Sequence, residues 1–291
     1  MRETKVLVVG LGDLGSKIAT GLVSSPVIHE FVIAGRAADT GLALERVACA
    51  CGDCRVRFVR LDAMRSDDIS QILHREAPRL VVQAASLLPP WYFRSRKDPI
   101  AHLILEAGLA AQLCAQLPVI RRLKEATKAA GYRGPVVDCS YPDVTHPILA
   151  RMQLAPTAGV GNAGLIHRFV SSRLRALGMR EVSHKVLAHH SDVLPVASSR
   201  PRAHTPPDAA PKVYVDGSLS SASADLRYRA APVRDGDSLN IVTASHAVAL
   251  IRALLRGLFH GKRPHRVSSV CPADGLSGSK RETFSSIYPL I

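Results

Sequence analysis

A strand, a glycine-rich turn and a helix follow one another near the start of the chain, and this order constrains the fold most. The apolar run at 5–9 has the length of a strand, and Gly10, Gly12 and Gly15 form a G-x-G-x-x-G turn. Apolar residues at helical spacing follow at 18–23, and a second apolar run follows at 31–34. This context predicts a phosphate-binding turn for a dinucleotide.

Each glycine of the turn has a physical task. Gly10 permits the tight turn, Gly12 lets the backbone approach a pyrophosphate, and Gly15 lets the helix pack closely on the strand. The first helical N–H groups, around Asp13 and Leu14, favour negative charge. We expect these five residues to bind the cofactor. A glycine-rich turn without a ligand is the alternative.

The end of the second strand bears on which dinucleotide binds. An NAD site usually has an acidic side chain there, whereas this strand ends in Ala34, Gly35 and Arg36. Because an arginine suits a 2′-phosphate, the sequence favours NADP, with NADPH preferred to NADH. A solvated surface arginine is the alternative. Ala84 and Ala85, after the fourth strand, complete the predicted cofactor site.

Strands alternate with helices through the first half of the chain. We expect strands at 56–61, 80–84 and 136–139, and helices at 67–74, 100–116 and 119–130, the last two separated by Pro118. This alternation predicts an α/β fold with a doubly wound parallel sheet, a Rossmann domain over residues 1–150.

The second half has a different pattern, which predicts an α+β substrate domain over residues 151–291. We expect helices at 165–177 and 243–255, strands at 183–188 and 213–215, and a proline-rich loop at 197–212.

Charge is unevenly distributed along the chain. The formal net charge is +14, of which +10 falls on residues 151–291, so an anionic partner is expected. Nucleic acid is not expected, because helix-turn-helix and zinc-finger spacings are absent from the sequence and only 4% of the residues are aromatic. A small anionic substrate remains.

Export and membrane insertion are not expected. The first residues lack the length and cleavage site of a signal peptide. The apolar window at 101–120 contains His102, Glu106 and Pro118, which predicts a buried helix rather than a membrane span. We therefore expect a cytoplasmic protein.

Three of the six cysteines, Cys49, Cys51 and Cys54, form a cluster. A structural zinc site needs four ligands, and a second pair at matching spacing is not visible in the sequence. We therefore expect no metal and free thiols. A partial metal or redox site is the alternative.

The stretches 159–169, 177–178 and 188–192 resemble the lactate/malate dehydrogenase family, which has a glycine-containing entry, an Asp-x-x-Arg-Phe helix start and a strand ending in His-Gly-Asp. The resemblance places Arg168 on the arginine that binds the substrate carboxylate and His190 on the proton-donating histidine. It also implies a homo-oligomer. The alternatives are a helix-surface arginine and an ordinary histidine.

Two departures from that family affect the expected chemistry. Leu165 stands where the family has the aspartate that orients the histidine, and Ser140 replaces an asparagine. A histidine without that carboxylate loses part of its tautomer control. Asp192, Asp143 or His189 then substitutes for it, or the substrate differs.

The segments 31–36 and 56–62 resemble the NADP domains of saccharopine dehydrogenases, which leaves an imine substrate open. Further substrate contacts are expected from Arg94, in a loop that could close over an anion, and from Thr243. A solvated loop and helix N-capping are the alternatives.

Together these patterns predict an NADP-dependent oxidoreductase for a small carboxylate-bearing keto, hydroxy or imine substrate. Its predicted catalytic residues are His190, Arg168 and Asp192, and its predicted substrate contacts are Arg168, Arg94, Ser140 and Thr243. An opine- or saccharopine-type imine reductase is the alternative enzyme, and a non-catalytic NADP sensor is the alternative outside catalysis.

Overall fold

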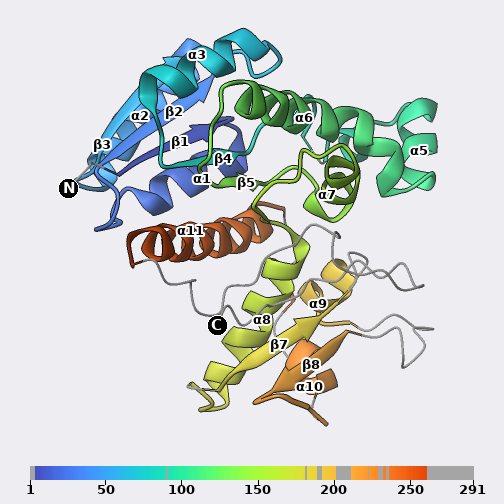
Figure 1. Cartoon of the computed structure of the whole chain (residues 1–291). Coiled ribbons are helices and arrows are strands. Elements are labelled where there is room, and N and C mark those ends of the chain that lie inside the picture. Colours follow the sequence, from blue (N-terminus) through green and yellow to red (C-terminus); the bar gives the residue numbers. More distant parts are fainter. Residues whose placement is uncertain are drawn as a thin grey trace. The chain divides into compact units, whose positions relative to one another are not determined.

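The computed structural model describes residues 4–89, 91–180, 182–188, 192–200, 211–221, 223–228, 232–233 and 236–260 (Figure 1). These residues form two compact units, the first ending at Gly159 and the second beginning at Val160. The sequence predicts the boundary after residue 150. The first unit extends further because Ala158–Gly159 form one more strand of its sheet.

The first unit is built on a six-stranded parallel sheet in the order β3-β2-β1-β4-β5-β6. Its strands are β1 (Lys5–Val9), β2 (Glu30–Gly35), β3 (Arg55–Arg60), β4 (Leu80–Gln83), β5 (Val136–Asp138) and β6 (Ala158–Gly159). This is the strand order of a doubly wound dinucleotide-binding sheet, so the predicted fold class is confirmed.

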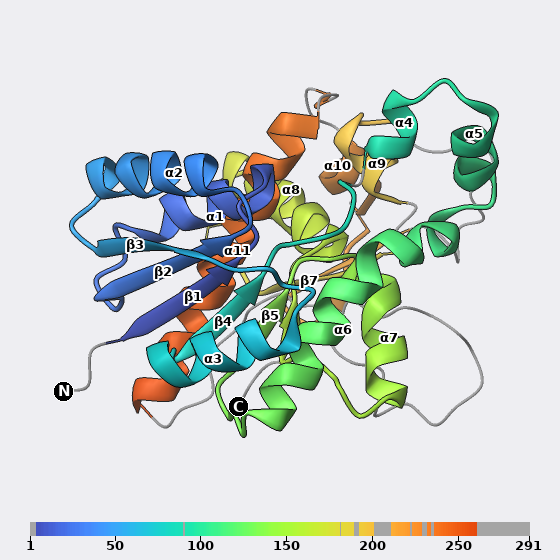
Figure 2. The same cartoon turned by 90° about the horizontal axis from the view of Figure 1, so that it is seen from above.

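Helices cover both faces of this sheet, with α1 and α2 on one face and α3 and α6 on the other (Figure 2). The helices of the unit are α1 (Asp13–Leu22), α2 (Ala38–Cys51), α3 (Ser66–Glu76), α4 (Tyr92–Ser95), α5 (Pro99–Glu106), the short 3₁₀ helix η1 (Leu109–Gln112), α6 (Leu113–Ala129) and α7 (Pro142–Arg151). Strands covered on both faces are apolar throughout, as β1 is from Val6 to Val9.

The break predicted at Pro118 is wrong. α6 runs through Pro118, and the helical run is interrupted earlier, where Gly108 has a positive φ of 84°. Pro118 is the sixth residue of α6, so the helix continues past it without the one backbone hydrogen bond that a proline cannot donate. The window at 101–120 is therefore divided among α5, η1 and α6.

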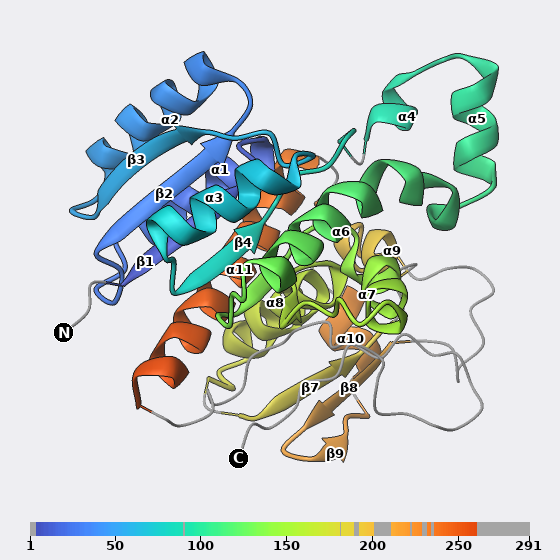
Figure 3. The same ribbon diagram turned by 45° about the horizontal axis from the view of Figure 1, so that its top comes forward.

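α4 and α5 follow β4 and lie away from the sheet, beyond the start of α6 (Figure 3). α5 begins at Asp98, whose carboxylate accepts a hydrogen bond from the Ala101 N–H at 2.9 Å. Ile100 and Leu103 of α5 are 69% and 63% exposed, so this helix packs little of its apolar surface.

The second unit combines helices with a small antiparallel sheet in the order β7-β8-β9, as the α+β prediction requires. Its elements are α8 (Asn162–Ala176), β7 (His184–Leu187), α9 (Val193–Ala197), β8 (Lys212–Val215), β9 (Ser218–Leu219), α10 (Ser223–Tyr228) and α11 (Gly236–His260). Leu165 and Val170 of α8 pack with Val186 of β7 and Val213 of β8 to form its core.

α11 is much longer than the helix predicted at 243–255. In the described part of the chain it is the one helix long and apolar enough to cross a membrane, over Gly236–Gly257 with a mean hydropathy of 1.5. This assignment uses only the length and composition of the helix, and a helix in the core of a protein can meet the same criteria. Ala247, Ile251 and Leu255 are fully buried here.

Candidate functional site

The glycine turn lies where β1 ends, between the carboxyl ends of β2 and β4. The Gly10 N–H donates to the Ala34 carbonyl at 2.9 Å, and the Ala84 N–H donates to the Val9 carbonyl at 2.8 Å. Gly10 has φ +100°, and a Cβ there would overlap the backbone of Ala85. The two predicted cofactor residues Ala84 and Ala85 therefore lie directly against this turn.

Gly12 and Gly15 occupy very different surroundings. A Cβ on Gly15 would overlap the carbonyl of Gly10, which explains the close helix packing. A Cβ on Gly12 would meet none of the described atoms within 4 Å, and Gly12 is exposed. Gly12 is also the N-cap of α1 and has no side chain with which to cap it. The turn therefore presents open space and helix N–H groups, which fit a pyrophosphate.

Charge at this helix start is not uniformly positive. Asp13 lies in the first turn of α1 and forms an ion pair with Lys17, four residues later. The carboxylate of Asp13 is thus partly neutralised within the helix. A contact from Asp13 to a cofactor comes most simply from its backbone N–H.

Two arginines mark the carboxyl ends of β2 and β3. Arg36 directly follows β2 and is exposed. Arg60 ends β3, where it is the register partner of Gly35, and it too is exposed. The sequence reasoning missed Arg60, although its place at the end of a strand adjacent to β2 could have shown it.

The carboxyl ends of β4 and β5 are joined by a buried hydrogen-bond network. The Ser140 hydroxyl lies 2.8 Å from the Ala85 carbonyl and 3.1 Å from Oε1 of Gln83. The Gln83 amide in turn donates to the Ala85 carbonyl at 2.6 Å. Ser140 is 3% exposed, so its hydroxyl fixes the two strand ends to each other. Its predicted substrate contact stays a prediction.

Beneath this network lie two fully buried ionisable side chains. Nε2 of His146 on α7 is 3.3 Å from Oδ2 of Asp138, and both side chains are 0% exposed. The same carboxylate accepts from the Ser140 N–H at 2.9 Å and from the Thr145 hydroxyl at 3.2 Å. These contacts hold the turn between β5 and α7 in one conformation.

Tyr141, in that turn, was not predicted as a site residue. It has φ +45° and ψ +56°, the left-handed conformation that glycine or asparagine adopts most easily. Its hydroxyl donates to Oε1 of Gln112 at 3.1 Å. Burial raises the pKa of the Tyr141 phenol, and the positive charge of Arg94 acts to lower it. Tyr141 is half-buried at the carboxyl end of β5.

The loop after β4 is held by the start of α6. The Leu87 N–H donates to the Ala115 carbonyl at 2.9 Å, and the Gln116 amide donates to the Leu88 carbonyl at 2.9 Å. The loop then leads into α4, where Arg94 is exposed. The loop that leads to Arg94 is therefore fixed at Leu87 and Leu88, whereas the side chain of Arg94 is exposed.

The second unit contains the remaining predicted residues that are described. Arg168 lies on α8, and its Nη2 donates to the Ser245 carbonyl of α11 at 2.9 Å. Burial, with a smaller contribution from Arg175, lowers the pKa of Arg168. Leu165 is 3% exposed in the apolar core, so its position contributes no polar group.

The other two predicted residues on this unit are engaged locally. Asp192 is 4% exposed and acts electrostatically on Arg227. Burial lowers the pKa of Arg227, and the charge of Asp192 acts in the opposite direction. The Thr243 hydroxyl donates to the Leu239 carbonyl at 3.0 Å, one turn earlier in α11. Because α11 begins at Gly236, Thr243 is not an N-cap. His190 and His189 lie outside the described residues.

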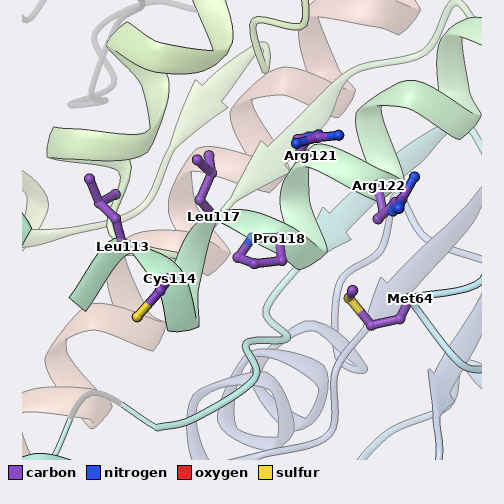
Figure 4. Close-up of a pocket in the computed structure, with 7 residues that line it drawn as sticks. All are labelled: Met64, Leu113, Cys114, Leu117, Pro118, Arg121 and Arg122. Carbon is purple, nitrogen blue, oxygen red and sulfur yellow. The ribbon is translucent and has the colours of Figure 1, made fainter. Parts of the chain in front are cut away.

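A surface pocket of about 250 Å³ lies along α6, and none of the residues that line it belongs to the glycine turn (Figure 4). Leu117 and Pro118 give it an apolar wall, and Met64 lines it from the turn after β3. Arg121 and Arg122 also line it, and both bind Glu125. It includes none of the predicted site residues.

Within the described ranges, no group of three or more His, Cys, Asp or Glu side chains is arranged to hold a metal ion. Cys49, Cys51 and Cys54 are free thiols, of which the first two are exposed. Burial raises the pKa of the Cys54 thiol to about 11.

No family model matches this sequence, and no curated protein matches it. Solved structures match it over nearly its whole length. The lactate dehydrogenase of Cryptosporidium parvum, solved with lactic acid and nicotinamide adenine dinucleotide, is 17% identical with a TM-score of 0.58, over 93% of this chain and 81% of that one. The chain has the fold of the lactate and malate dehydrogenases.

Two further matches agree on that fold. The minor L-lactate dehydrogenase of Enterococcus mundtii, in its ligand-bound form, is 16% identical over 99% of this chain and 90% of that chain, with a TM-score of 0.58. The apo malate dehydrogenase of Picrophilus torridus is 14% identical over the same shares, also with a TM-score of 0.58. The glycine turn lies in the unit with the six-stranded parallel sheet, the part of the chain in which the sequence predicts cofactor binding.

Proposed function

We propose that the chain is a nicotinamide-dependent oxidoreductase acting on a small carboxylate-bearing keto, hydroxy or imine substrate. The observation that carries this proposal is the glycine turn at the switch point of the sheet, with open space over Gly12 and the backbone of Ala85 packed against Gly10. Structural matches solved with lactic acid and the dinucleotide, or with NADH, support the same reaction class.

A bound nicotinamide supplies the hydride, and residues of the chain bind and orient the two reactants. Gly10, Gly12 and the first N–H groups of α1 would hold the pyrophosphate. Arg168, with four N–H donors besides the one given to Ser245, can bind a substrate carboxylate in bidentate geometry. The resemblance alone gives His190 the role of proton donor.

The proposed cofactor is NADP rather than NAD. Arg36 is exposed at the end of β2, where an NAD site has a carboxylate, and Arg60 ends the adjacent strand. The solved structures with a named dinucleotide ligand contain nicotinamide adenine dinucleotide or NADH. The proposal of NADP therefore rests on the residues of this chain and not on those structures. We further propose a cytoplasmic homo-oligomer.

Calorimetric titration with NADPH and NADH tests the cofactor site. We expect NADPH to bind, and Gly12→Ala to weaken binding by about tenfold or more because a methyl group would displace the pyrophosphate. Gly236→Ala is the matched control, since Gly236 is also an exposed glycine at a helix start with open space around a Cβ. If neither dinucleotide binds the wild-type protein, the proposed function is wrong.

A second pair of variants tests the choice of NADP. Arg36→Asp should weaken NADPH binding by about 10- to 100-fold, the value of a charged hydrogen bond to phosphate, and leave NADH binding unchanged or stronger. Arg46→Asp makes the same charge change at an exposed position of α2 and should do neither. Equal effects of the two variants would show that Arg36 acts only through net charge.

Oxidation of NADPH by keto acids, with and without added amines, separates the candidate reactions. Turnover with a keto acid alone supports the carbonyl reductase. Turnover that requires an amine supports the opine- or saccharopine-type imine reductase. Tight cofactor binding without turnover on either panel supports the non-catalytic sensor.

A further inference from the structure

We propose that Tyr141 is the proton donor to the substrate in this reaction, with Gln112 as its positioning residue. The inference rests on the proposed function, because it concerns the group that protonates the reduced carbonyl or imine. It differs from the role that the resemblance gives to His190.

The backbone of Tyr141 is the first observation. A bulky residue in the left-handed region costs about 1 to 2 kcal/mol and persists only where its surroundings hold it. The Tyr141 carbonyl accepts from the Val144 and Thr145 N–H groups, each at 3.0 Å, and from the Thr145 hydroxyl at 3.0 Å. Pro142 follows directly, which disfavours the right-handed region for Tyr141. Glycine or asparagine would fit this turn with less strain, so the phenol itself requires an explanation.

The polar contact of the Tyr141 side chain bears on that explanation. Tyr132 is one of the partly buried side chains that pack against the apolar core of the first unit. The side chain of Tyr141 instead ends in a polar contact, the 3.1 Å hydrogen bond to Oε1 of Gln112. Gln112 is 8% exposed, so the partner of the phenol is itself buried.

The location of Tyr141 within the sheet is the second observation. In a doubly wound sheet each half of a dinucleotide lies over one half of the strands, and the glycine turn at β1 assigns the pyrophosphate to the middle. Tyr141 follows β5 and adjoins Ser140, which is bonded to Ala85 at the end of β4. The phenol thus belongs to the β4–β5–β6 half, on the side where the nicotinamide is expected.

The chemistry of the phenol suits this position. A bound, reduced nicotinamide would supply the substrate carbon with a hydride, and with it two electrons, and would itself be oxidised. The O–H bond of Tyr141 breaks, its proton bonds to the substrate oxygen or nitrogen, and a phenolate remains until solvent returns a proton. Arg94 favours that phenolate by its positive charge. By rotating its amide, Gln112 can accept from the phenol or donate to the phenolate.

The absence of a histidine-orienting carboxylate at residue 165 agrees with this assignment. Leu165 is buried in the apolar core of the second unit, so the position cannot hold an imidazolium in place. A proton donor already fixed by Gln112 does not need such a group.

The first test requires no substrate. Tyrosinate absorbance is titrated for wild type and Tyr141→Phe, with and without NADP⁺, and the difference isolates Tyr141. We expect NADP⁺ to lower the pH of the Tyr141 transition by about one unit, because the proposal requires the positive ring of a bound, oxidised nicotinamide to lie near the phenol. Tyr132→Phe is the matched control and should leave the shift intact. A Tyr141 transition that NADP⁺ does not move overturns the proposal.

The second test uses the substrate found in the keto-acid and amine panels. Tyr141→Phe should lower kcat by about 100-fold or more, with NADPH affinity within twofold of wild type, since general acid catalysis contributes that much. Tyr132→Phe should retain turnover. Normal turnover of Tyr141→Phe, together with loss of turnover in His190→Gln, would assign the proton to His190 instead. Failure of the wild type to bind NADPH would show that the proposed function itself is wrong.

Discussion

The rings of His167 and His184 are stacked, with their centroids 4.4 Å apart and their planes 12° from parallel. His167 comes from α8 and His184 begins β7, where its Nε2 lies 3.0 Å from the Ser171 hydroxyl. Burial, followed by the charges of His184, His246 and Arg168, lowers the pKa of His167 from 6.5 to about 3. This part of the second unit therefore holds His167 in its neutral form.

Acid should destabilise the second unit through this pair. The unfolded chain protonates His167 near pH 6.5 and the folded chain only near pH 3, so stability is lost as pH falls through that interval. Between pH 7.5 and 5 the loss from His167 is about 2 kcal/mol. Urea unfolding at both pH values should show a smaller pH effect in His167→Gln. His102→Gln, which changes an exposed histidine paired with Glu106, should leave the pH effect unchanged.

An ion cluster around the buried carboxylate of Glu76, near the amino-terminal edge of the parallel sheet, provides a second prediction. Glu76 is bound by Lys5 at 3.1 Å, by Arg75 at 2.8 Å and by Arg57. Burial alone would raise the pKa of Glu76, but the hydrogen bonds from these three cations outweigh it and lower the pKa to about 2. The stability that Glu76 contributes is therefore present above pH 4.5 and is lost as pH falls toward 2.

Glu76→Gln should lower the free energy of unfolding by about 2 kcal/mol at pH 7, because it removes the buried carboxylate that three partly exposed cations share. Glu125→Gln is the control. Glu125 also binds two arginines, Arg121 and Arg122, but it does so at the surface, so its loss should cost less than about 0.5 kcal/mol. Equal costs for the two variants would contradict a special role for burial.

The sheet and the glycine turn were predictable because their signals are local. Buried parallel strands are continuous apolar runs, as at Val6–Val9, and the three glycines stand at the spacing that a strand–turn–helix crossing requires. The break between α5 and η1 was not predictable in the same way, because Pro118 is the stronger helix-breaking signal in the sequence, whereas the positive φ of Gly108 exists only in the folded chain.

The turn after β5 could not be predicted from local patterns. Its serine binds Gln83, 57 residues earlier, and its tyrosine binds Gln112, 29 residues earlier. Tyr141 also adopts a conformation that its residue type disfavours, so propensity pointed away from it. Contacts between distant segments fix this part of the site, and those contacts exist only in the folded chain.

Gly10 should tolerate no side chain. Gly10→Ala combines a positive φ with overlap on the Ala85 backbone, so we expect a loss of about 3 kcal/mol or more in stability. Gly131→Ala separates the two effects, since Gly131 has φ +64° but open space around a Cβ, and it should cost only about 1 kcal/mol. Thermal unfolding of both variants measures the difference. Equal costs would mean that backbone strain alone makes Gly10 necessary.

The cysteines of the first unit should differ sharply in reactivity. Cys49, Cys51 and Cys114 are exposed, whereas Cys54 is buried and burial raises its pKa to about 11. Burial also raises the pKa of Cys139 well above its ordinary value. Since the thiolate is the reactive and metal-binding form, iodoacetamide should modify the first three in the folded protein and the other two only after denaturation. Peptide mass spectrometry measures this. Rapid labelling of Cys54 in the folded protein would revive the partial metal or redox site for the Cys49–Cys54 cluster.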